Sequence, residues 1–113
     1  MGMDKKQAQQ HVAKDMAICA SYFFMGSEAA KRNKDVELEK SSKRTADVAL
    51  AQAIRLSDKA YATKQLEIAI GDHQRIMNNN ILNVSILVRK YKDMCKQTLT
   101  DPDSRLKFWM NKK

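Results

Sequence analysis

Apolar residues recur in the first third of the chain at the spacing of one helix face. Val12, Met16, Cys19 and Phe23 follow one another in steps of four, three and four, which places them on one side of an α-helix. Polar residues off this stripe include Lys5, Lys14, Asp15 and Glu28. The pattern predicts a helix over residues 5–31.

A second helical pattern covers residues 37–57. Its inner face is rich in alanine, which permits close approach of a neighbouring helix. This face consists of Ala46, Ala49, Leu50, Ala53, Ile54 and Ser57. Ser57 or Asp58 is a suitable N-cap for the helix that follows.

The longest apolar stripe runs from Leu66 to Met94 in alternating steps of four and three. Its members are Leu66, Ile70, His73, Met77, Asn80, Val84, Leu87, Tyr91 and Met94. A continuous helix over residues 60–98 would be about 58 Å long. Gly71, or Asn78 to Asn80, is a place where it could kink or divide in two. The preferred interpretation is one kinked helix.

The end of the chain carries a helix-start signal. Asp101 suits the N-cap position and Pro102 the first helical position. We expect a short capping helix that folds back, so that Trp109 covers the end of the bundle. The residues expected to form this closure are Tyr91, Asp101, Pro102, Arg105 and Trp109.

Composition supports a helical protein. The chain has 113 residues with only three glycines and one proline, too few for the frequent turns of a sheet protein. The sequence therefore predicts one all-α domain over residues 1–113. Its architecture is a small antiparallel helical bundle of three long helices and a short C-terminal capping helix.

The formal net charge is +8, which favours anionic partners such as nucleic acid or a membrane surface. Much of the positive charge lies near the C-terminal end. Candidate contacts for an anionic partner are Arg89, Lys90, Lys92, Lys96, Arg105 and Lys107. The competing interpretation is that these side chains form ordinary solvated helix faces.

Signals for catalysis and for metal binding are weak. The sequence has no CxxC pair, no glycine-rich phosphate loop and no paired carboxylates beside a histidine. His11 and Asp15 are spaced as two metal ligands on one helix, but two ligands do not make a site. His73 lies on an apolar stripe, as a hydrogen-bonded core histidine would. We expect no enzyme, no metal site and no cofactor.

Cys19 and Cys95 both lie on apolar stripes and therefore point inward. A bridge between them would close a long loop, which in the chain-entropy view contributes about 4 kcal/mol. Two buried free thiols, acting as small apolar groups, are the alternative. Spacing alone leaves both open.

The two ends of the chain show a family resemblance. The segments are "MAICASYF" and "LVRKYKDMCKQTLTDPDSRLKFW". They resemble a group of small, exported, all-helical and uncharacterised bacterial proteins. In that group one cysteine precedes aromatic residues in the first helix, and a second stands before a DPxxR turn. The resemblance implies a Cys19–Cys95 disulfide and a periplasmic or secreted location.

The chain departs from that group in one respect. Its apolar run over residues 16–26 is preceded by Asp15 and diluted by Ser21 and Gly26, unlike a signal peptide. A leader removed before Met3 would reconcile the two observations.

Together these features predict a non-enzymatic, exported helical interaction or accessory protein of unknown process. Its partner and oligomeric state are left open, with another protein preferred to nucleic acid or an anionic membrane surface as the partner. The alternative is a small basic helical protein that binds nucleic acid in the cytoplasm.

Overall fold

The computed structural model describes residues 3–112, and this part of the chain is all-α, as predicted. Met1, Gly2 and Lys113 lie outside the described residues. The elements in chain order are α1 (Lys5–Arg32), α2 (Val36–Leu56), α3 (Lys59–Ile76), the 3₁₀ turn η1 (Ile81–Asn83), α4 (Val84–Thr100) and α5 (Pro102–Met110).

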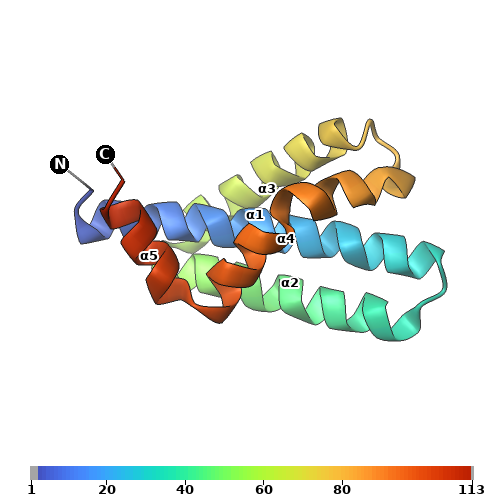
Figure 1. Ribbon diagram of the computed structural model, residues 1–113, viewed down its shortest axis with the longest axis horizontal. Coiled ribbons are helices and arrows are strands. Elements are labelled where there is room, and N and C mark those ends of the chain that lie inside the picture. Colours follow the sequence, from blue (N-terminus) through green and yellow to red (C-terminus); the bar gives the residue numbers. More distant parts are fainter. Residues whose placement is uncertain (1–2, 113) are drawn as a thin grey trace.

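Helix α1 is the centre of the fold. Each of the other four α-helices packs on it, and Figure 1 shows α2 running back along α1 while α4 crosses it obliquely. Asp4 starts α1 through a capping box, in which its side chain accepts from the backbone N–H of Gln7. The described chain ends lie at the same end of the elongated molecule, which measures 47 × 24 × 23 Å.

The connection between α1 and α2 is a tight helix stop. The N–H of Asp35 donates to the carbonyl of Ala30, and the N–H of Lys34 donates to the carbonyl of Lys31. This is the Schellman pattern, with Lys34 in the left-handed region at φ 59°. Asp35 then caps α2 by accepting from the N–H of Leu38, so that the chain reverses within a few residues.

The predicted single helix over residues 60–98 is wrong. The chain forms two α-helices there, separated by a turn that begins at Met77. Asn78 and Asn79 have φ of 55° and 56°, a left-handed conformation that asparagine tolerates better than most residues. The Asn80 side chain then caps η1 by accepting from the N–H of Leu82. The three asparagines therefore divide the helix, and the molecule has five α-helices within the described residues where four were expected.

The start of the last helix agrees with its sequence signal. Asp101 caps α5 by accepting from the N–H of Ser104, and Pro102 occupies the first turn. Proline fits there because its missing N–H would have no helical partner. The chain turns at this corner and brings α5 against α1.

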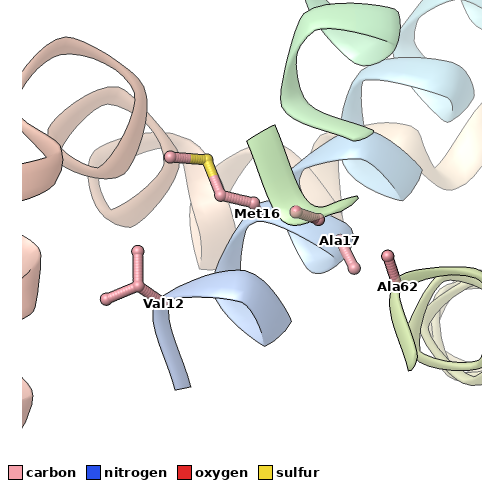
Figure 2. Close-up of a cluster of buried hydrophobic side chains, with 5 residues drawn as sticks. Val12, Met16, Ala17 and Ala62 are labelled. Carbon is pink, nitrogen blue, oxygen red and sulfur yellow. The ribbon is translucent and has the colours of Figure 1, made fainter. Parts of the chain in front are cut away.

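Alanine dominates the core. Of the sixteen buried apolar residues that the structure describes, ten are alanine. Figure 2 shows one cluster, in which Val12, Met16 and Ala17 of α1 lie near Ala62 of α3. Small side chains allow the helices to lie close together, but each buries little apolar area. Cross-links between helices therefore matter more here than in a core of large side chains.

Candidate functional site

Cys19 and Cys95 join α1 to α4. Their sulfur atoms lie at disulfide distance, their Cα atoms are 5.4 Å apart, and both residues are fully buried. The separation falls in the usual range for a bridge. The break after α3 makes this approach possible, because α4 turns back and crosses α1 instead of continuing away from it.

The bridge lies in an apolar cluster. Ala20 and Ala49 are buried against it, and the Met94 sulfur lies 3.8 Å from the Cys19 sulfur. Thr98 is also fully buried and donates its hydroxyl to the Met94 carbonyl at 2.7 Å. Both cysteines are fully buried, so the bridge is part of the core, and Cys95 also borders a surface hollow.

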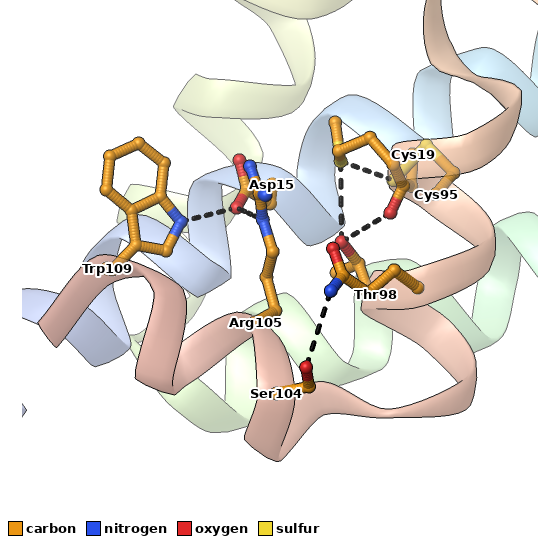
Figure 3. Close-up of polar contacts among 9 residues, drawn as sticks. Asp15, Cys19, Cys95, Thr98, Ser104, Arg105 and Trp109 are labelled. Atoms are coloured by element: carbon orange, nitrogen blue, oxygen red, sulfur yellow. Dashed lines mark hydrogen bonds and ion pairs between the residues drawn. A yellow bond between two sulfur atoms is a disulfide. The ribbon is translucent and has the colours of Figure 1, made fainter. Parts of the chain in front are cut away.

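A second link joins α5 to α1, and Figure 3 shows it. One carboxylate oxygen of Asp15 accepts two bonds of 2.7 Å, from Arg105 Nε and from Trp109 Nε1. Asp15 is 5 % exposed. We call these three residues the Asp15 latch.

Asp15 lies off the apolar stripe of α1, so the sequence pattern does not reveal its role. Helix α1 is covered by four neighbours, so its buried surface is wider than one stripe. Residues on other sides of the helix, such as Ala13 and Ser21, are also buried. The signal for its role is the pair Arg105 and Trp109. Their side-chain N–H groups need a hydrogen-bond acceptor when they are buried.

His11 does not share a metal site with Asp15. Its ring stacks on Trp109 with centroids 4.3 Å apart, while the Asp15 oxygen is occupied by the latch. Among residues 3–112, no group of three His, Cys, Asp or Glu side chains is arranged to hold a metal ion.

Tyr91 belongs to a different region from the other predicted closure residues. Asp101, Pro102, Arg105 and Trp109 meet at the α4–α5 corner and on α5. The Tyr91 ring instead lies 4.7 Å from the His73 ring and 6.4 Å from the Tyr22 ring. The structure therefore brings four of the five residues together.

Ser21 and His73 form a buried polar pair. Ser21 Oγ lies 2.7 Å from His73 Nδ1, and the two residues are at most 1 % exposed. Burial lowers the pKa of His73 from 6.5 to about 4, with Asp72 opposing and Lys90 reinforcing the shift. His73 is thus neutral at pH 7. A serine beside a histidine is a catalytic pattern, but this pair is sealed from solvent and fastens α3 to α1.

A surface groove follows α1 between α2 and α4. It consists of two adjoining hollows of about 370 Å³ and 470 Å³, which share Thr45 and Leu99 in their lining. We call it the α2–α4 groove. Its floor is Met16, Tyr22, Phe23, Cys95 and Leu99; its walls are Ser41, Arg44, Thr45, Val48, Gln52 and Arg55 on one side and Val88, Lys92, Lys96, Thr100 and Pro102 on the other.

The structure separates the predicted anionic-partner contacts. Lys92 and Lys96 line the groove, whereas Arg105 is held by Asp15. Lys90 lies over the Tyr91 ring, 5.5 Å from its centroid. Arg89 and Lys107 are exposed outside the groove. The six residues do not form one cluster.

No family model, curated protein or solved structure matches this chain. Within the described part of the chain, the helices lack the combined length and apolar character that crossing a membrane requires.

Proposed function

We propose that this protein is a non-enzymatic, exported interaction or accessory protein that works in an oxidising compartment by binding another protein. The observation that carries the proposal is the Cys19–Cys95 pair, buried at disulfide distance between α1 and α4. Such bridges form and persist in the periplasm and outside the cell, and they are rare in the reducing cytosol.

The polar groups of the core support a structural interpretation. Asp15 accepts from Arg105 and Trp109, and His73 is bonded to Ser21 away from solvent. These groups fasten helices to one another, which is what a rigid binding scaffold needs. In a core so rich in alanine, such links also supply stability.

Fractionation of cells tests the proposal. The gene is expressed from its natural locus with any codons upstream of Met3, and thiols are alkylated in intact cells before separation. We expect the protein in the periplasmic or extracellular fraction with Cys19 and Cys95 protected from alkylation. Recovery in the cytosol with both thiols alkylated would overturn the proposal.

The alternative function is nucleic-acid binding in the cytoplasm, and the exposed lysines of α4 favour it. Lys92 and Lys96 stand one helical turn apart and both are exposed. A salt-dependent affinity for duplex DNA at physiological ionic strength, combined with free thiols in cells, supports this alternative.

A further inference from the structure

The α2–α4 groove combines two chemistries that suit one class of partner. Its floor is apolar, formed by side chains such as Phe23 and Leu99. Two valines on its walls are exposed, Val48 at 56 % and Val88 at 36 %. A partner that covers these exposed apolar groups removes them from water, which favours binding.

The edges of the groove are basic. Arg44 and Arg55 line it from α2, and Lys92 and Lys96 line it from α4. No aspartate or glutamate belongs to the described residues that line the two hollows. An occupant is therefore favoured when it carries apolar groups toward the floor and negative charge toward both edges.

The shape of the groove selects among anionic occupants. The distance along α4 from Val88 to Thr100 is about 18 Å, the length of roughly three turns of helix. The hollows are open to solvent and are not enclosed cavities. A helix lying there would keep its polar back in water, whereas an acyl chain would leave much of its apolar surface exposed. A DNA duplex is too wide to reach the recessed floor.

We propose that the α2–α4 groove is the docking site for an acidic amphipathic helix of another protein. Its apolar stripe covers Val48, Val88 and Leu99, and acidic residues beside the stripe pair with Arg44, Lys92 and Lys96. This is the helix-in-groove mode of recognition. The inference rests on the proposed function, since it names the class of protein that the interaction module binds.

Three labelled peptides of about four helical turns, long enough to span the groove, test the inference. The first has a leucine stripe flanked by glutamates. The second has the same stripe flanked by lysines, and the third has the glutamates with the leucines scrambled. Fluorescence anisotropy with the full chain measures their affinities. We expect the first peptide to bind at least about tenfold more tightly than either of the others, with an affinity that falls as salt rises.

Variants of the protein locate the binding. The double variant Lys92→Glu/Lys96→Glu reverses one edge, and Val48→Asp disrupts the apolar contact. Each variant is expected to lower the affinity for the first peptide by about tenfold or more. The matched control is Lys43→Glu/Lys64→Glu, which reverses two exposed lysines outside the groove and leaves the affinity unchanged. Circular dichroism verifies that every variant remains folded.

Three results would overturn the inference. The first is similar affinity for all three peptides, and the second is equal weakening of peptide binding by the control variant. The third is that duplex DNA binds more tightly than the first peptide and loses affinity in Lys92→Glu/Lys96→Glu but not in Val48→Asp. These results differ from a failure of the proposed function. If the protein is found reduced in the cytosol but still binds the acidic peptide, the proposal of export fails and the proposal that the groove binds a helix stands.

Discussion

Arg105 donates from Nε to Asp15 across ninety positions of sequence, at a distance of 2.7 Å. Trp109 Nε1 donates to the same carboxylate oxygen, so one acidic residue of α1 holds two successive turns of α5. The Asp15 and Arg105 side chains are only 7 % and 13 % exposed. Because both side chains are shielded from water, removing one of them leaves the charge of the other buried and uncompensated.

Asp15→Asn tests the Asp15 latch. The substitution keeps the size of the side chain and removes its charge, so that the Arg105 guanidinium stays buried without a counter-ion. We expect the free energy of unfolding to fall by about 3 kcal/mol. The chain has a single tryptophan, so its fluorescence should shift to longer wavelength as Trp109 gains contact with water.

Asp47→Asn is the control, because Asp47 is exposed on α2. It should change stability by less than about 0.5 kcal/mol. Equal stabilities for wild type and Asp15→Asn, with identical tryptophan spectra, would show that the latch does not hold α5.

Signals carried by neighbouring residues predicted the fold well, and signals that depend on distant contacts did not. Asp101 and Pro102 mark the start of α5 because capping is local. The heptad-like stripe was misleading at Asn80, since alternating steps of four and three continue through the break. Here the conformational tolerance of Asn78 and Asn79 outweighed the apolar pattern.

The candidate site was predictable only in part. The stripes correctly placed both cysteines inward, but their distance depends on how α4 returns after the break. The α2–α4 groove is lined by residues of α1, α2, α4 and the start of α5, so no local pattern reveals it. One sequence signal for it is Val48, an apolar residue that is exposed on α2.

Reduction tests the Cys19–Cys95 bridge. The two cysteines are 76 positions apart, so opening the bridge greatly increases the freedom of the unfolded chain. We expect reductant to lower the free energy of unfolding by about 4 kcal/mol, measured by urea denaturation. The double variant Cys19→Ala/Cys95→Ala should be similarly weakened and should not respond to reductant. Two reactive thiols in protein purified from an oxidising compartment would contradict the bridge.

Lys34→Gly tests the stop between α1 and α2. Lys34 has φ 59°, which costs a residue with a Cβ atom about 1 kcal/mol that glycine does not lose. We therefore expect the variant to be more stable, by up to about 1 kcal/mol, in urea denaturation. Lys31→Gly is the matched comparison, since Lys31 lies within the last turn of α1, and it should lose stability. Destabilisation by Lys34→Gly would refute the helix-stop geometry.

The buried pair of Ser21 and His73 makes stability depend on pH. Burial lowers the pKa of His73 to about 4 in the folded protein, whereas the ordinary pKa of a histidine, which applies to the unfolded chain, is 6.5. The unfolded chain therefore binds more protons than the folded protein between these limits, and stability falls as pH decreases from 6.5 toward 4. This residue should account for a loss of about 3 kcal/mol between pH 7 and pH 4.

His73→Asn removes this titration and keeps a polar atom near the position of Nδ1. The variant should be less stable at pH 7, because its smaller side chain leaves a cavity, but its stability should fall less steeply below pH 6.5. Ser21→Ala is the control: it loses the hydrogen bond, with a cost of about 1 kcal/mol, yet retains a buried histidine and hence the steep dependence. Urea denaturation at several pH values measures all three proteins. Parallel curves for wild type and His73→Asn would show that protonation of His73 does not limit stability in acid.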